Sequence, residues 1–369
     1  MRDNFMMGSP YEGMEGMFQD IPESEKMDVD VEAVREEKGI YPDAQERFDN
    51  ELQERGWEQV HDIAEGIEYP SLDDWVEFRL EHRRGAKFFP CFVKDGEGEV
   101  SFIKFQISDN QEHLRSLEQE AAVLAEIRDK LPDVNCPKFH EFQAQEEGGL
   151  AFLKLDAIDP SEGRVALVDE WTGEQAADLA RQLHLLENFD LDSLSDRVKT
   201  LPAFEREETV NDGLRHYADE AEGYLDDKTL QAVRDIASRL QSKEVMVHGD
   251  ACLKNLIANA DQTATIVDWE LAAKDFIGRD AGKFMTKIER SKNPEVKDAF
   301  MEAYVNPDGQ FDAERSEGMY VGMLMENIYQ YTHLIEKVID KGRQKEYPDT
   351  PERMEEYKQN INRILEKLG

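Results

Sequence analysis

Apolar residues in the stretch 72–108 follow the alternating or clustered patterns that are typical of β-strands. The expected strands cover residues 75–80, 88–93 and 100–107. The polar sequence DGEG at residues 95–98 predicts a hairpin turn between the last two. We therefore expect a three-stranded antiparallel sheet in the first half of the chain.

Apolar residues at helical spacing predict helices before and after these strands in the sequence. One is expected within residues 42–67. Another follows the third strand, with Ser108 or Asp109 as its cap and Pro132 as its stop. Residues 149–158 are predicted to form one more strand, and most of the remaining chain is predicted to be helical.

In this helical part, Thr172 and Gln175 form a capping-box pattern at the start of a predicted helix. His184 lies within that helix and is expected to be a core histidine whose hydrogen bonds are satisfied. A later stripe at helical spacing is expected to be core rather than a ligand box. Its members are Tyr320, Leu324, Ile328, Tyr331 and Ile335.

The chain has 369 residues, which is long enough for two domains with sizeable cores. It has no run of ~18 apolar residues, so no transmembrane helix is expected. The first residues lack the basic start and the apolar core of a secretory signal. The three cysteines lie far apart and are expected to be free thiols in a reducing cytoplasm. They are Cys91, Cys136 and Cys252.

The charge balance is strongly acidic, with 44 Lys and Arg against 82 Asp and Glu, a net charge of −38. Such a surface repels nucleic acid and anionic membranes, so neither is expected as a partner. The acidity could steer a cationic substrate, or it could belong to a halophilic protein that works in high salt. Because the acidic residues are spread along the whole chain, we favour salt adaptation, in which screening removes most long-range steering.

The candidate chemistry lies in residues 245–270, with the sequence VMVHGDACLKNLIANADQTATIVDWE. Two short apolar runs each give way to polar loop residues, which should bring Asp250, Asn255 and Asp268 into one cleft. One carboxylate can orient an acceptor hydroxyl and take its proton, while an amide oxygen and a second carboxylate suit Mg²⁺. Each residue alone would more often be a turn residue, but the set is specific.

These motifs, HGDACLKN and DWE, resemble those of the aminoglycoside phosphotransferase and choline kinase superfamily, which is related to protein kinases. The resemblance implies that Asp250 is the catalytic base and that Asn255 and Asp268 are Mg²⁺ ligands. Asp280, twelve residues after Asp268, matches an Asp that supports the catalytic loop, although GRDAGKF departs from the family's GDPxxDLA-like sequence. His248 is expected to organise the loop through hydrogen bonds.

The resemblance also assigns nucleotide-binding residues. Lys104, within FIKF, would bind the α and β phosphates of ATP and be held by Glu120, within EAAVL. The alternative for Lys104 is an exposed strand lysine. Backbone groups near Leu155 and Ala157 would bind adenine. The loop HRRGAK lacks the glycine-rich sequence of protein kinases, although backbone amides near Gly85 could still cover the phosphates.

The implied fold is α+β and protein-kinase-like, with a small antiparallel-sheet lobe plus one helix and a larger, mostly helical lobe. We expect an acidic mobile tail over residues 1–40, the nucleotide-binding lobe with an N-terminal helix over 41–156, and the catalytic and substrate lobe over 157–369. The expected function is ATP- and Mg²⁺-dependent phosphorylation of a small-molecule hydroxyl.

The alternative function is a catalytically idle, nucleotide-binding regulator that acts through partners. The presence of all four polar residues argues against it, because an idle protein would need only some of them: Lys104, Asp250, Asn255 and Asp268. The sequence leaves open the identity of the acceptor, the choice between ATP and GTP, and the oligomeric state. Aminoglycosides, amino alcohols, amino acids and sugars all remain candidate acceptors.

Overall fold

The structure is a computed structural model, and the residues that it describes form two compact units, each built from three stretches of the chain. The described residues are 31–64, 67–68, 70–81, 87–144, 149–158, 163–205, 210–240, 242–289, 293–340 and 349–369. Unit 1 comprises Met1–Ala166, Lys254–Asp261 and Thr265–Leu271. Unit 2 comprises Leu167–Leu253, Gln262–Ala264 and Ala272–Gly369.

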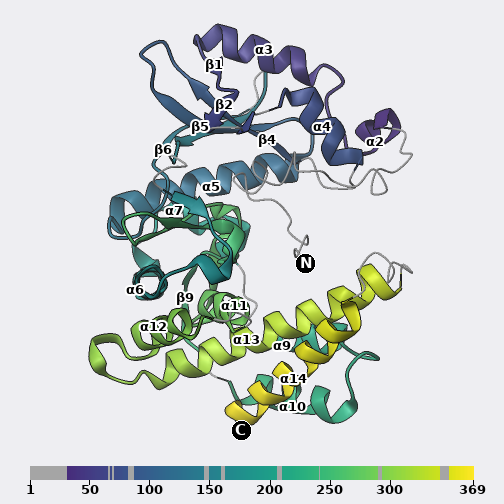
Figure 1. The fold of residues 1–369 in the computed structure, drawn as a ribbon, viewed down its shortest axis with the longest axis vertical. Coiled ribbons are helices and arrows are strands. Elements are labelled where there is room, and N and C mark those ends of the chain that lie inside the picture. The colour runs from purple at the N-terminus through teal and green to yellow at the C-terminus, as the bar shows by residue number, and fades with distance from the viewer. Residues whose placement is uncertain are drawn as a thin grey trace. The chain divides into compact units, whose positions relative to one another are not determined.

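Unit 1 contains an antiparallel sheet of five strands in the order β1-β4-β5-β7-β6 (Figure 1). The strands are β1 (Glu58–Gln59), β4 (Phe88–Lys94), β5 (Val100–Gln106), β6 (Phe139–Gln143) and β7 (Phe152–Asp156). The predicted hairpin between β4 and β5 is confirmed. The sequence did not predict β6, an edge strand in which every residue is half-buried, so that no alternation of apolar and polar positions marks it.

The predicted strand at residues 75–80 is wrong, because this stretch belongs to helix α4 (Leu72–Glu81). Its buried residues recur at helical rather than strand spacing. They are Leu72, Trp75, Val76 and Leu80. The hydroxyl oxygen of Ser71 accepts a hydrogen bond from the backbone N–H of Asp74 and so caps the first turn.

The predicted helix within residues 42–67 is shorter than expected. Helix α3 (Ala44–Arg55) ends at Gly56, whose left-handed φ of 64° stops it. Helix α5 (Gln111–Lys130) begins after Asn110, whose side chain accepts a hydrogen bond from Glu112 N–H. The cap of α5 is therefore Asn110 rather than Ser108 or Asp109.

Helices cover both faces of the sheet in unit 1, with α3 on one side and α5 on the other (Figure 1). The ring of Phe48 on α3 packs edge-on against Phe105 of β5, with 5.2 Å between ring centroids. Because side chains alternate along a strand, the neighbouring Lys104 points to the opposite face, toward α5. The two-residue period of β5 thus directs Lys104 toward α5.

The described end of the predicted tail is folded. Residues Val31–Glu37 form helix α2, and Arg35 forms an ion pair with Asp73 at 2.9 Å. Ile40 is buried and forms a β-bridge with Ser108. Residues 1–30 of the predicted tail, and Gly85 in the predicted phosphate-covering loop, lie outside the described residues.

A second, three-stranded sheet in the order β11-β10-β8 includes the strands that flank the predicted metal-binding residues. Its strands are β8 (Gly163–Val165), β10 (Leu256–Asn259) and β11 (Ala264–Ile266). The 3-10 helix η4 (Leu253–Asn255) directly precedes β10. The 3-10 helix η5 (Trp269–Leu271) follows β11 after Val267 and Asp268. A further pair, β2 (Asp62–Ala64) and β3 (Ile67–Glu68), completes the strands of unit 1.

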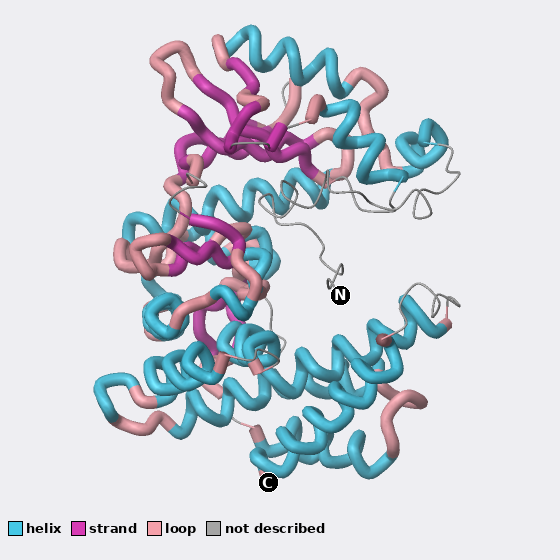
Figure 2. Tube along the Cα trace, viewed as in Figure 1, coloured by secondary structure: helices cyan, strands magenta, loops and turns pink. Residues whose placement is uncertain are grey.

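Unit 2 is mostly helical, whereas strands are concentrated in unit 1 (Figure 2). Its α-helices are α6 (Gly173–Glu187), α7 (Asp196–Lys199), α8 (Pro202–Glu205), α9 (Val210–Glu220), α10 (Asp227–Arg239), α11 (Arg279–Ile288), α12 (Pro294–Val305), α13 (Ala313–Leu334) and α14 (Thr350–Leu368). The strands β9 (Glu244–Val247) and β12 (Ala273–Phe276) form an antiparallel pair. The predicted capping box of Thr172 and Gln175 is confirmed at the start of α6.

Most of the predicted apolar stripe is confirmed as core on α13, where Leu324, Ile328 and Tyr331 are buried, whereas Tyr320 is half-buried. Ile335, also buried, begins the turn of π-helix that follows, Ile335–Ile339. Further 3-10 turns are Val168–Glu170, Leu191–Ser193 and Pro307–Gly309. None of the described helices is both long enough and apolar enough to cross a membrane.

Helices α11 and α13 approach so closely that their backbones touch. A Cβ atom placed on Gly282 would lie 2.5 Å from the carbonyl carbon of Gly322, and one on Gly318 would lie 2.0 Å from the carbonyl oxygen of Ile277. Real Cβ atoms do not come this close to backbone atoms. The glycines therefore fix the separation of the two helices.

Gly282→Ala is expected to lower the free energy of unfolding by about 1–3 kcal/mol, because the added methyl group must push the two helices apart. Denaturant unfolding measures the change. Gly213→Ala on α9 is the matched control, since its Cβ would meet only the flexible end of Met325 within 4 Å. Equal stability of Gly282→Ala and wild type would contradict the close contact.

Candidate active site

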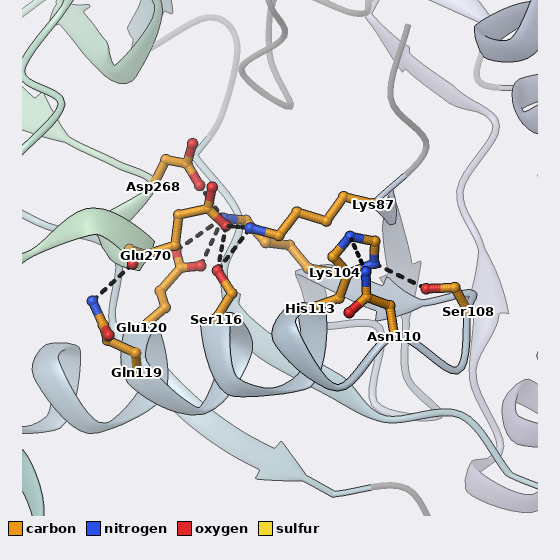
Figure 3. Close-up of polar contacts among 10 residues, drawn as sticks. All are labelled: Lys87, Lys104, Ser108, Asn110, His113, Ser116, Gln119, Glu120, Asp268 and Glu270. Atoms are coloured by element: carbon orange, nitrogen blue, oxygen red, sulfur yellow. Dashed lines mark hydrogen bonds and ion pairs between the residues drawn. The ribbon is translucent and has the colours of Figure 1, made fainter. Parts of the chain in front are cut away.

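Lys104 lies at the centre of a buried polar cluster in unit 1 (Figure 3). Its Nζ donates to both carboxylate oxygens of Glu120, at 2.9 and 2.8 Å, and to Oδ1 of Asp268, at 2.6 Å. An ammonium group has three N–H donors, and these three bonds use them all. The ion pair that the sequence predicted between Lys104 and Glu120 is therefore present, and Asp268 is a second carboxylate partner of Lys104.

Charge keeps Lys104 protonated in this cluster. Burial by itself lowers the pKa of Lys104, but the carboxylates of Asp268 and Glu120 raise it above the ordinary lysine value. Burial also raises the pKa of Glu120, whose side chain is 0% exposed. A buried ammonium is stable only with such partners, so loss of both carboxylates would leave an uncompensated charge.

Four residues that the sequence analysis did not single out bind helix α5 to the segment after Asp268 (Figure 3). The side chain of Glu270 accepts from Lys87 Nζ at 2.6 Å and from Ser116 Oγ at 2.7 Å. Gln119 Nε2 donates to the backbone oxygen of Glu270 at 2.8 Å. Ser116, Gln119 and Glu120 share one face of α5 at helical spacing, a pattern that could have indicated them.

Asn255 and Asp268 belong to adjoining parts of unit 1. Asn255 is fully buried, and its backbone oxygen accepts from Val267 N–H at 3.0 Å. Asp268 has a φ of 66°, in the left-handed region that residues other than glycine rarely adopt. Such strain is concentrated at functional sites, where the surrounding structure enforces it.

The chemistry of this cluster fits a divalent cation. Two ammonium groups, Lys87 and Lys104, face three carboxylates, Glu120, Asp268 and Glu270, which leaves one negative charge. The predicted ligands, an amide oxygen of Asn255 and a carboxylate of Asp268, are the hard donors that Mg²⁺ prefers. In kind these donors suit Mg²⁺, and their role as its ligands remains a prediction.

The predicted catalytic loop lies in unit 2, directly after β9. Asp280, at the start of α11, accepts from the backbone N–H of His248 at 2.6 Å and from that of Gly249 at 3.0 Å. Gly249 has a φ of 82°, which glycine adopts without strain. The buried ring of His248 accepts from Asp250 N–H through Nδ1 at 3.3 Å. His248 and Asp280 thus lie where they can hold the loop.

Asp250 has a partner that the sequence did not predict. Lys283, on α11, donates from Nζ to Oδ1 of Asp250. Lys283 lies three residues after Asp280, on the same face of the helix, so helical periodicity from the predicted Asp280 could have found it. The structure therefore gathers His248, Asp250, Asp280 and Lys283 in unit 2.

The single cleft that would hold Asp250 together with Asn255 and Asp268 remains a prediction. Leu155 is buried in β7 opposite Phe102, and Ala157 follows this strand half-buried. These positions leave their predicted role in adenine binding untested.

His184 differs from its prediction as a histidine whose hydrogen bonds are satisfied. It is half-buried on α6, and no described residue forms a hydrogen bond with its Nδ1. Burial lowers the pKa of His184, which favours the neutral ring.

Glu187, at the end of α6, binds the residue that precedes helix α11. It is buried and accepts from Gly278 N–H at 2.8 Å, from the Tyr304 hydroxyl at 2.5 Å and from Arg315 Nε at 3.2 Å. Burial raises the pKa of Glu187 to about 7, although Tyr304, Gly278 and Arg315 oppose the shift. The folded state therefore keeps this carboxyl protonated at a pH where the unfolded chain has released its proton.

Glu187→Gln is expected to flatten the pH dependence of stability between the ordinary glutamate pKa of 4.5 and the raised pKa of about 7. In the wild type, the Glu187 carboxyl contributes fully to the free energy of unfolding below its unfolded pKa. This contribution, about 3 kcal/mol, is lost as the pH rises through the folded pKa. Urea unfolding at a series of pH values measures it. A variant with the same pH dependence as wild type would contradict the raised pKa.

A family model described as the phosphotransferase enzyme family matches residues 82–316 of the chain. The protein belongs to this phosphotransferase family. No curated protein matches the sequence. The match includes Lys104, Glu120, the HGD loop, Asp268 and Asp280, so the family's span contains both polar clusters described above.

Solved structures with a similar fold confirm the predicted α+β, kinase-like architecture. The GDP and kanamycin complex of APH(2")-IIia has a TM-score of 0.53 and 14% identity, with 75% of this chain and 92% of that chain covered. A choline/ethanolamine kinase family protein from Mesorhizobium loti has a TM-score of 0.50 and 12% identity, with 75% and 85% covered. At such identities the likeness extends to the fold alone.

Proposed function

We propose that the protein uses Mg²⁺ and ATP to phosphorylate a hydroxyl group of a small molecule. The observation that carries the proposal is the buried Lys104, which is held between Glu120 and Asp268 in a member of the phosphotransferase family. In phosphoryl transfer, such a lysine binds nucleotide phosphates, and a helix glutamate keeps it in place. The family neighbours that bind kanamycin or carry the choline/ethanolamine kinase description support a small-molecule acceptor.

In this proposal, Asp250 orients the acceptor hydroxyl and takes its proton as the new O–P bond forms. The bond between the γ-phosphorus of ATP and its bridging oxygen breaks in the same step, and ADP leaves. Lys104 binds the α and β phosphates, and backbone groups near Leu155 and Ala157 bind the base. Asn255 and Asp268 would hold Mg²⁺, which when bound would neutralise charge on the phosphates. Catalysis is then mainly a matter of positioning and electrostatics.

The proposed compartment is the cytoplasm. The three cysteines are thiols rather than disulfides, and Cys91 and Cys252 are buried, which supports a reducing environment. The net charge of −38 supports a halophilic protein, so assays belong in both low and molar KCl.

ADP release from MgATP, across a panel of aminoglycosides, amino alcohols, amino acids and sugars, tests the proposal. MgGTP is run in parallel because the nucleotide in one neighbour is GDP. An acceptor-dependent signal that disappears in Asp250→Asn would support a small-molecule kinase and identify the acceptor class. Nucleotide binding without turnover on any acceptor would favour an idle regulator, and absence of both would refute the proposal.

A further inference from the structure

Asp250 and Lys283 form a largely buried ion pair. The Asp250 side chain is 14% exposed and that of Lys283 is 18% exposed. Exposed ion pairs contribute little to stability, because water screens their charges and the long side chains lose conformational entropy. A pair this well shielded restrains both groups more strongly, because moving either one leaves a charge without its partner.

Helix α11 binds the catalytic loop at two points, one helical turn apart. Asp280 in its first turn binds the backbone of His248 and Gly249, and Lys283 one turn later binds the side chain of Asp250. The close glycine contact with α13 fixes the separation of the two helices. A single rigid helix therefore sets both the path of the loop and the orientation of its carboxylate.

A second carboxylate, from α13, supports Lys283. Glu326 is 3% exposed and interacts with the charge of Lys283, and it forms an ion pair with Lys287 Nζ at 3.4 Å. Gln330 donates to Glu326 Oε1 at 2.8 Å and holds it in place. Burial lowers the pKa of Lys283, but Glu326 and Asp250 raise it above the ordinary lysine value. Lys283 therefore remains an ammonium ion.

We propose that Lys283 is a positioning residue for Asp250 that fixes the carboxylate in the orientation required to receive the acceptor's proton. This inference rests on the proposed role of Asp250 as the base. Proton transfer requires the base within hydrogen-bonding distance of the acceptor hydroxyl, so a carboxylate that can rotate spends less time in the productive geometry. The pair with Lys283 removes that freedom.

Lys283→Met is expected to lower kcat about 30- to 100-fold, a loss of the size that misplacement of a reacting group causes. KM for MgATP should stay within about twofold, because nucleotide binding is assigned to other residues. Lys283→Arg should recover most of kcat, since it keeps the charge and the hydrogen-bond donors. ADP release from MgATP is the readout, with water as the acceptor and with the best acceptor from the panel.

Lys287→Met is the matched control. Lys287 lies one turn further along α11 and pairs with Glu326 rather than with Asp250. Its loss removes a positive charge from the same helix, so it should leave kcat near that of wild type. Thermal unfolding of every variant separates a folding defect from a positioning defect, and Lys283→Gln provides a second neutral variant of similar polarity.

The outcomes separate this inference from the proposed function. If Lys283→Met and Lys283→Gln fold and turn over within about threefold of wild type while Asp250→Asn is inactive, the positioning role is refuted and the base assignment stands. Full turnover by Asp250→Asn would refute both. A loss in Lys287→Met equal to that in Lys283→Met would show that helix charge, rather than contact with Asp250, matters.

Discussion

Asp250→Asn is expected to lower kcat about 100- to 10,000-fold, the usual contribution of a general base. The amide has nearly the same size as the carboxylate but cannot accept the acceptor's proton. The loop should keep its path, because Asp280 binds the backbone of His248 and Gly249 and not the Asp250 side chain. Affinity for MgATP should therefore be unchanged.

Single-turnover kinetics measure the chemical step of this variant, and calorimetry measures its nucleotide affinity. Asp275→Asn on β12 is a suitable control, because it removes a partly exposed carboxylate that pairs with Arg279 at 3.8 Å. The control should retain wild-type turnover. Unchanged turnover in Asp250→Asn would eliminate Asp250 as the base.

Asp268→Ala is expected to remove most of the increase in nucleotide affinity that Mg²⁺ causes, at least about tenfold for loss of a metal ligand. In the structure Asp268 occupies one of the three donors of Lys104. Loss of Asp268 frees that donor for a phosphate oxygen, while both bonds from Lys104 to Glu120 can remain. Affinity for metal-free ATP should therefore be retained or slightly increased.

Titration calorimetry of ATP with and without Mg²⁺ measures, for Asp268→Ala, the affinity for metal-free ATP and the increase in affinity that Mg²⁺ causes. Asp129→Ala, at an exposed position on α5 in the same unit, controls for the loss of a carboxylate. It should respond to Mg²⁺ as wild type does. A full Mg²⁺ response in Asp268→Ala would rule out Asp268 as a principal ligand.

The sequence was most informative where local pattern and chemistry agree. The β4–β5 hairpin follows from alternating residues on either side of a turn, and the same alternation directs Lys104 away from Phe105. The pattern was ambiguous at residues 75–80, where buried Trp75 and Val76 are adjacent and suit a helix as well as a strand. Strand β6 was missed because its half-burial at a sheet edge leaves no periodic signal.

By itself the sequence identified the family's fold and the candidate chemical groups of the site. HGD, Asn255, Asp268 and the Lys104–Glu120 pair could be recognised because residue type and order along the chain carry that information. Only the tertiary structure decided which residues support these groups. Lys283 against Asp250, and Lys87 with Ser116 against Glu270, join residues that are between 33 and 183 positions apart. Such contacts depend on how helix faces pack, and local sequence periodicity does not specify that packing.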